Sequence, residues 1–258
     1  TCEMLDTICD VIVNNMLLDA RTCKGDIVIP ENVTSICDSA LACNDQITSV
    51  KILSNVKYCG TDVFAHCQNL VSVNYNADTS YIPGECFWDC PSLEKVTMSD
   101  NITDIYYSAF SECSKLKDVT LSKNLQNINS YAFYNCLELD SINLPATLEY
   151  IGDLAFGICK KLETIYIPAS VISCTAFHSC PNFKSYIVDP KNENYSSLNG
   201  WLCNKNGDTV IDFPDGITDI VFPSSIKTIG RSAFDSAEFE EITIPDTVTK
   251  IEDGAFAN

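Results

Sequence analysis

One recurring phenylalanine constrains this chain more than any other sequence feature. It returns every 23 residues, at Phe64, Phe87, Phe110, Phe133 and Phe156. Three further columns keep the same phase: an apolar or cysteine residue five positions before each phenylalanine, a cysteine three positions after it and a leucine six positions after it. A constant period with several columns in phase predicts a solenoid, in which each unit buries its apolar face only against its neighbours.

Each unit contains one stretch in which apolar and polar residues alternate. In residues 162–167, Ile165 and Ile167 point to one face while Thr164 and Tyr166 point to the other. This alternation predicts a strand. The rest of each repeat unit is expected to contain a turn, a short second extended piece and a compact turn or helical segment. Matching strands are expected at 47–52, 70–75, 93–98, 116–121, 139–144, 183–188, 217–222 and 239–244. Ten such rows, stacked ~4.8 Å apart, give a sheet roughly 45 Å long.

The first 23 residues lie outside the periodic region. Leu5, Ile8, Val11 and Ile12 recur at close to helical spacing, which predicts a helix over residues 2–20. We expect residues 1–23 to form a helical cap, because the end row of an array otherwise exposes its core to water. A membrane-surface helix is the alternative, and the lack of a basic face disfavours it. Residues 24–258 then form a curved, right-handed solenoid.

The period is interrupted between residues 189 and 216. Asn206-Gly207 stands between two strand-like runs, which predicts a two-residue hairpin turn. An insertion that keeps the flanking rows in phase must bulge from one face. It is either a binding finger, with Trp201 as a candidate contact residue, or a hairpin that completes an irregular row.

Charge narrows the range of partners. The chain has 16 lysine and arginine residues against 35 aspartate and glutamate residues, a net charge of −19. This balance argues against nucleic acid and against anionic membranes, because both attract positive charge. No apolar run of ~18 residues predicts a transmembrane segment, and no signal peptide is visible. Since the chain begins at Thr1 and stops at Asn258 in mid-repeat, we expect a mature or excised fragment.

The repeat resembles a known family. Residues 148–162 contain Ile151-Gly152, Ala155-Phe156 and Cys159, and they match the consensus of the BspA-type leucine-rich repeat. Ile229-Gly230 with Ala233-Phe234 repeats that pattern. The resemblance covers about residues 24 to 258 and implies a leucine-rich-repeat solenoid on a bacterial or protist cell surface. It also implies extracellular binding of proteins of a host or a neighbouring cell.

Cysteine is unusually frequent, with 15 residues. The in-phase cysteines would stack at one strand spacing with parallel side chains, a geometry unsuited to disulfides, so we expect buried thiols. Cys2 and Cys9 would lie about 10 Å apart along the predicted helix, too far to bridge. Cys9 with Cys23 is the more feasible pair.

Metal and catalytic motifs are weak. Cys174, His178 and Cys180 offer soft ligands for zinc, but Cys180 belongs to the core column and no four-ligand spacing repeats. His66 and His178 both follow the phenylalanine at a variable turn position, so a Cys-His nucleophilic pair is disfavoured. No glycine-rich phosphate loop or paired-carboxylate motif occurs. We therefore expect no metal, no cofactor and no enzymatic activity, and a hydrolase is the least favoured function.

The polar side of the predicted sheet is the candidate binding surface. Its candidate contact residues are Lys51, Asn74, Thr97, Thr120, Asn143 and Tyr166. A broad, shallow, polar surface suits a protein or glycan ligand, such as an extracellular matrix protein, better than a small molecule. The alternative is a solvated face on a structural spacer that carries another domain.

Overall fold

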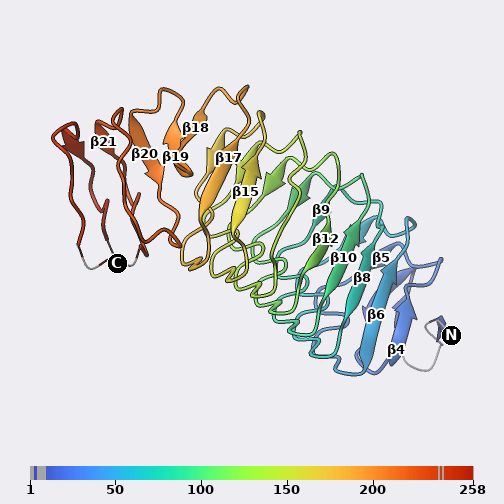
Figure 1. Cartoon of the computed structure of the whole chain (residues 1–258). Coiled ribbons are helices and arrows are strands. Elements are labelled where there is room, and N and C mark those ends of the chain that lie inside the picture. The colour runs from blue at the N-terminus through green and yellow to red at the C-terminus, as the bar shows by residue number, and fades with distance from the viewer. Residues whose placement is uncertain (1–2, 5–9, 238, 240, 258) are drawn as a thin grey trace.

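The computed structural model describes residues 3–4, 10–237, 239 and 241–257. They form a curved β-solenoid in which the rows follow one another from the N-terminal to the C-terminal end (Figure 1). The 23-residue spacing appears directly as the offset between paired strands, so the predicted solenoid is confirmed. The part of the chain that the structure describes contains no α-helix, and therefore none long and apolar enough to cross a membrane.

The longer strands pair in parallel and form one face of the array, here called the long-strand face. Its main sheet contains β1 (Glu3–Met4), β4 (Gly25–Val28), β6 (Ile47–Ile52), β8 (Ser72–Tyr75), β10 (Lys95–Met98) and β12 (Asp118–Thr120). Pairing resumes with β15 (Thr164–Ile167) and β17 (Ser185–Val188). Val50, Val73 and Val96 point inward in register, and their neighbours point to solvent. This two-residue alternation separates the core from the exposed face.

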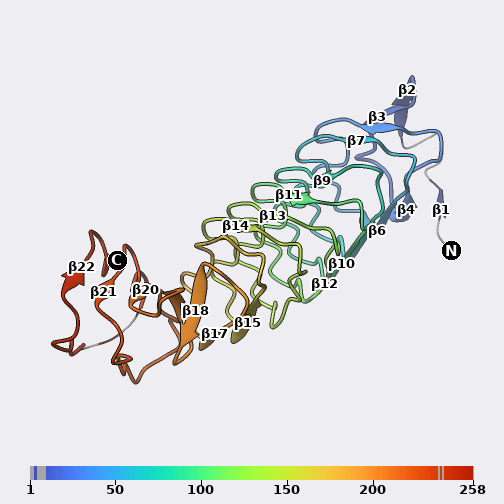
Figure 2. The same cartoon turned by 90° about the horizontal axis from the view of Figure 1, so that it is seen from above.

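Two-residue strands line the opposite side, here called the short-strand face (Figure 2). They are β5 (Ser35–Ile36), β7 (Tyr58–Cys59), β9 (Tyr81–Ile82), β11 (Asp104–Ile105), β13 (Asn127–Ile128), β14 (Tyr150–Ile151) and β16 (Ser173–Cys174). In each of these strands the second residue is buried and the first is half-buried or exposed. The apolar column five residues before each phenylalanine therefore closes the core from this side.

The phenylalanine column forms one stack inside the solenoid. Ring centroids from Phe64 through to Phe177 are 5.1 to 5.3 Å apart, and successive ring planes differ by at most 9°. The cysteine column lies beside it, and each thiol donates to a backbone carbonyl of the row before. The Sγ of Cys113, for example, lies 3.1 Å from the carbonyl oxygen of Phe87. The twelve cysteines from Cys37 to Cys203 are free, whereas Cys23 is disulfide-bonded. Its predicted partner Cys9 lies outside the described residues.

The predicted N-terminal helix is wrong over residues 10–20, where the structure has strands and turns. Strands β2 (Val11–Val13) and β3 (Met16–Asp19) form an antiparallel hairpin, and β3 adds to the short-strand face by pairing with β5. Asn14 and Asn15 both have positive φ, 50° and 63°, as a two-residue hairpin turn of this hand requires. The Asn14-Asn15 turn, which follows the β-branched run Val11–Val13, outweighs the helical spacing. Residues 1–2 and 5–9 of the predicted helix lie outside the described residues.

The insertion builds a second, smaller core. Strands β18 (Tyr195–Leu198), β19 (Trp201–Asn204) and β20 (Thr209–Asp212) are antiparallel, and Asn206-Gly207 lies in the turn between β19 and β20. Parallel pairing resumes from β20 to β21 (Thr228–Ile229) and β22 (Lys250–Ile251). A separate apolar cluster around Trp201, Phe213 and Phe234 forms the core of these rows. The strands predicted at 139–144, 217–222 and 239–244 are not formed within the described residues.

Candidate functional site

Strand register brings four predicted binding residues into one line on the long-strand face. Lys51 pairs with Asn74, Asn74 with Thr97, and Thr97 with Thr120. Thr97 is half-buried and the other three are exposed. Among the residues that the structure describes, Lys51 has no ion-pair partner, so its ammonium group is available to a ligand.

The other three predicted residues differ in position. Asn143 is exposed, but its row has no strand between β12 and β15. Tyr166 is 47% exposed on β15, and its hydroxyl donates to Asp189 Oδ2 at 2.6 Å, which raises the pKa of Tyr166. Trp201 does not belong to any exposed surface: it is 1% exposed, with its ring edge-on to Phe213 and Phe222. The insertion uses this tryptophan as core because its rows lack the main phenylalanine stack.

Many cations on the long-strand side are already paired with the adjacent row. Lys95 Nζ lies 2.6 Å from Asp118 Oδ2, and Lys117 Nζ lies 2.7 Å from Glu94 Oε2. The side chains of both pairs are about half exposed, so water and salt screen the pairs and each contributes little stability.

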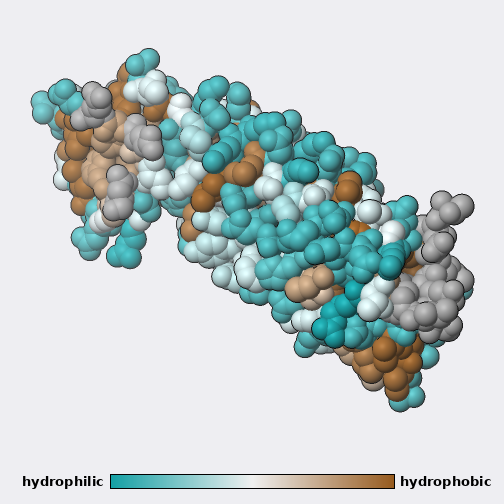
Figure 3. Space-filling model, turned by 90° about the horizontal axis from the view of Figure 1, so that it is seen from below, coloured by the Kyte–Doolittle hydropathy of each residue, from teal (hydrophilic) through white to brown (hydrophobic). Residues whose placement is uncertain are grey.

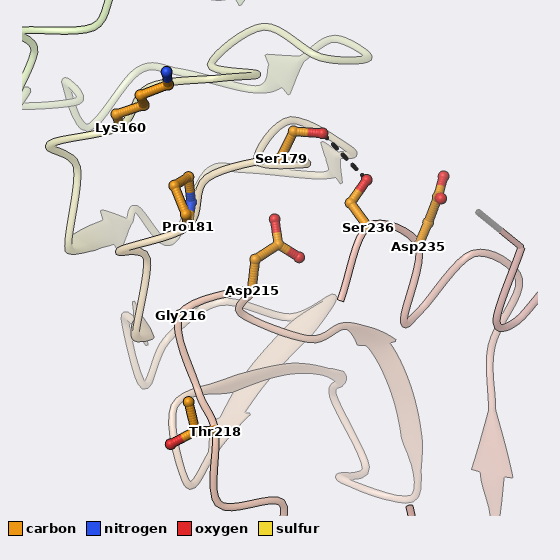
Figure 4. Close-up of a pocket in the computed structure, with 8 residues that line it drawn as sticks. All are labelled: Lys160, Ser179, Pro181, Asp215, Gly216, Thr218, Asp235 and Ser236. Carbon is orange, nitrogen blue, oxygen red and sulfur yellow. Dashed lines mark hydrogen bonds between the residues drawn. The ribbon is translucent and has the colours of Figure 1, made fainter. Parts of the chain in front are cut away.

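Two neighbouring depressions lie where the two cores meet. One hollow of about 660 Å³ is lined by Lys160, Ser179, Asp215, Asp235 and Ser236, among others (Figure 4). A second, of about 620 Å³, shares Ser179, Asp235 and Ser236 with the first. The hydroxyl groups of Ser179 and Ser236 are 3.2 Å apart and link the two sides. We call the combined depression the junction cleft.

Two carboxyl groups of the junction cleft have raised pKa values. Burial raises the pKa of Asp212, although the Tyr186 hydroxyl donates to this carboxyl group. Burial also raises the pKa of Asp215 to about 7, although the backbone N–H of Cys180 donates to it at 2.9 Å. The buried Nδ1 of His178 has no hydrogen-bond partner among the residues that the structure describes. The cleft therefore contains one carboxyl group, that of Asp215, which changes charge near neutral pH.

The chemistry available in the cleft is limited. Burial raises the pKa of the Cys174 thiol, and that of Cys180 to about 12, so neither is a thiolate at neutral pH. This disfavours nucleophilic catalysis by cysteine with His178. Across the described part of the chain, no three histidine, cysteine, aspartate or glutamate side chains are grouped so as to hold a metal ion. The sequence analysis did not predict the cleft. The one sequence feature that points to it is the pair of aspartates around Phe213-Pro214.

Comparison with known proteins agrees with this architecture. A family model for the BspA type leucine rich repeat region matches residues 21–117, 80–199 and 213–258, in six copies. The solved structure of a leucine rich cell surface protein from Faecalibacterium prausnitzii is 26% identical, with a TM-score of 0.74, and the match covers 93% of this chain and 69% of that one. None of the curated proteins compared matches the chain.

Two further structures share the fold. A leucine-rich repeat protein from Eubacterium ventriosum is 22% identical with a TM-score of 0.60, covering 93% of this chain and 57% of that chain. A leucine-rich repeat protein from Bacteroides ovatus is 23% identical with a TM-score of 0.55, covering 91% and 70%.

The stacked rows, the two sheet faces and the interior phenylalanine column define a leucine-rich-repeat solenoid. Such arrays present extended surfaces in place of an enclosed active site. The chain belongs to the BspA-type leucine-rich repeat family.

Proposed function

We propose that this chain is an extracellular interaction module that binds a protein or glycan through its long-strand face. The observation that carries the proposal is the line of Lys51, Asn74, Thr97 and Thr120, which strand register holds at adjacent rows. Side chains held on a rigid sheet lose little entropy on binding, which favours recognition of an extended ligand. The similarity to a cell surface protein supports an extracellular location.

Tyr166 extends the proposed surface beyond the point where the main sheet ends. Its ring is half exposed, and its hydroxyl is held in place by Asp189. Tyrosine is enriched among residues that dominate binding energy, because it offers a large rigid ring and a polar end. Lys51 and Tyr166 are therefore the proposed anchors, with the polar residues between them completing the contact.

The test is binding of the purified chain to immobilised matrix proteins, mucins and a glycan array. For any ligand retained, the Lys51→Ala and Tyr166→Ala variants should each weaken binding about tenfold, equivalent to about 1.4 kcal/mol. Lys57→Ala is the matched control, because Lys57 is also exposed but precedes β7 on the short-strand face. The proposal fails if no ligand is retained, which favours a structural spacer, or if the control weakens binding as much as Lys51→Ala.

A further inference from the structure

The short-strand face carries an aromatic surface that the long-strand face lacks. Seven of the eleven tyrosines lie on the short strands or in the turns that follow them. Together with one tryptophan they form what we call the aromatic band, made of Tyr58, Tyr81, Trp88, Tyr106, Tyr107, Tyr131, Tyr134 and Tyr150. On the paired strands of the long-strand face, Tyr166 is the one exposed aromatic residue in the described part of the chain.

Five rings of the aromatic band touch another ring of the band. Tyr81 and Tyr106 stack with centroids 5.2 Å apart and planes 7° apart. Tyr131 lies edge-on to both Tyr107 and Tyr134, at 5.5 and 5.4 Å. These contacts hold the rings in place before any ligand arrives.

Much of the band remains open to solvent. Tyr58 is 50% exposed, Tyr106 43%, Tyr107 52% and Trp88 36%. Aromatic side chains gathered on one face, rather than scattered singly, mark interaction surfaces.

Within the four segments that carry most of the aromatic band, every charged residue is acidic. These segments are 79–90, 102–113, 125–136 and 148–159, and they contain no lysine or arginine. The same segments contain Glu85, Asp89, Asp104, Glu112, Glu149 and Asp153. Lysines in these rows, such as Lys95 and Lys117, lie on the long-strand side and are paired there. Within these four segments the rings are therefore flanked by acids and by no cation, whereas Lys57 directly precedes Tyr58 and Arg231 lines a hollow together with Tyr134.

Acidic residues of adjacent rows influence one another on this face. Partial burial, together with the nearby carboxyl group of Asp62, raises the pKa of Glu85. Between the same two rows, His66 Nδ1 lies 2.8 Å from Asp89 Oδ2, with the His66 ring 4.6 Å from that of Trp88. Like charges held together are relieved by a cation.

We infer that the aromatic band binds an extended, arginine- or lysine-containing segment of a partner protein. The cationic side chains would lie over the exposed ring faces, where the ring quadrupole attracts them, and donate hydrogen bonds to the flanking carboxylates. Arginine fits best, because its planar guanidinium stacks on a ring and bonds a carboxylate at the same time. Nucleic acid and anionic membranes carry the wrong charge for this face.

This surface is independent of the long-strand face and is tested with different variants. The probe is a fluorescent, unstructured peptide of alternating arginine and serine, titrated by anisotropy at low and physiological salt. The matched peptide replaces each arginine with citrulline, which keeps the shape and removes the charge. We expect the arginine peptide to bind at least about tenfold more tightly than the citrulline peptide, with weakening as salt rises.

Variants separate the rings and the carboxylates from general negative charge. Tyr107→Ser should weaken binding of the arginine peptide about tenfold, whereas Tyr107→Phe, which keeps the ring, should not. Glu85→Gln should weaken binding severalfold. Asp140→Asn removes the same charge from an exposed position on the long-strand side and should leave binding unchanged.

Two results would overturn the inference. Equal binding of the arginine and citrulline peptides would show that the band does not recognise cations and would favour a neutral ligand such as a glycan. Equal weakening by Asp140→Asn and Glu85→Gln would reduce the effect to net charge. Hydrogen exchange on the wild-type protein gives a second measurement, since the peptide should protect segments 79–90 and 102–113 and not β8 or β10.

Discussion

Replacing Phe110 with alanine tests whether the phenylalanine stack holds the solenoid together. Phe110 is completely buried and lies between Phe87 and Phe133, with centroids 5.2 Å away on both sides. Removing a buried phenylalanine ring costs about 3–5 kcal/mol, from lost transfer energy and the cavity left behind. Since this ring has two stacked partners, we expect about 4–5 kcal/mol, the upper part of that range.

The loss should spread beyond the row that carries the substitution. Each row is stabilised by its two neighbours, and the backbone N–H of Phe110 donates to Ala132 of the next row at 2.8 Å. The assay is urea unfolding followed by circular dichroism, with hydrogen exchange to locate the loosened rows. We expect faster exchange in the rows of Phe87 and Phe133 as well as in the substituted row.

The matched control for this experiment is Tyr107→Ala. Tyr107 is also aromatic and lies three residues away, but it is half exposed, so its removal should cost less than about 1 kcal/mol. A loss below about 1 kcal/mol for Phe110→Ala, or faster exchange confined to its own row, would refute the view that stacked rows share one core.

Two further predictions concern groups with shifted pKa values. The pKa of Asp215 in the folded protein is about 7, above its ordinary value of 3.8. Between these two pH values the folded protein binds more protons than the unfolded chain. The free energy of unfolding therefore falls as the pH rises from about 4 to about 7. Asp215→Asn keeps an acceptor for the Cys180 N–H, and at pH 8 it should stabilise the rows around the junction cleft by about 1–3 kcal/mol, a figure reduced for partial exposure. Urea unfolding at pH 5 and pH 8 measures this effect. The control Asp219→Asn, at an exposed position, should show no such effect. Cys43 is exposed, whereas burial raises the pKa of the Cys113 thiol, so a thiol reagent should modify Cys43 first and reach Cys113 only when the protein is unfolded. Mass spectrometry of the labelled peptides decides this, and early labelling of Cys113 would contradict the buried cysteine column.

The apolar surface at the array's ends illustrates how the rows depend on one another. Viewed from below, apolar side chains gather near the two ends of the molecule, and the central rows are mainly polar (Figure 3). Ile251 is half exposed in the last described row, whereas Ile151 at the corresponding place in a central row is buried. A row is covered only where another row lies against it.

Features that recur with the period could be predicted, and those that occur once could not. The inward positions of Phe110, Cys113 and Leu116 followed from their columns, because stacking in register repeats each contact in every row. The N-terminal hairpin occurs once, and its local spacing also fits a helix. Trp201 was misplaced for a related reason: inside an insertion, no column indicates which side chains are buried.

The compact turns show a further limit of sequence reasoning. Tyr131, Leu154 and Ile158 adopt left-handed backbone conformations, with φ of 59°, 52° and 58°. Such values disfavour a large side chain by about 1–2 kcal/mol, so residue identity alone argues against them. Row-to-row hydrogen bonds, such as those from the N–H groups of Tyr131 and Ile158, hold the turns in this shape.

The periodic sequence specifies the solenoid, its row length and the contents of its main core, because contacts between residues 23 positions apart follow directly from the repeat. It does not show that seven tyrosines from five rows gather beside the short strands, or that Asp212 and Asp215 meet His178 where two cores join. These groupings depend on how each row turns and where the stack is interrupted. They arise from packing between distant segments, which a local pattern of residues does not encode.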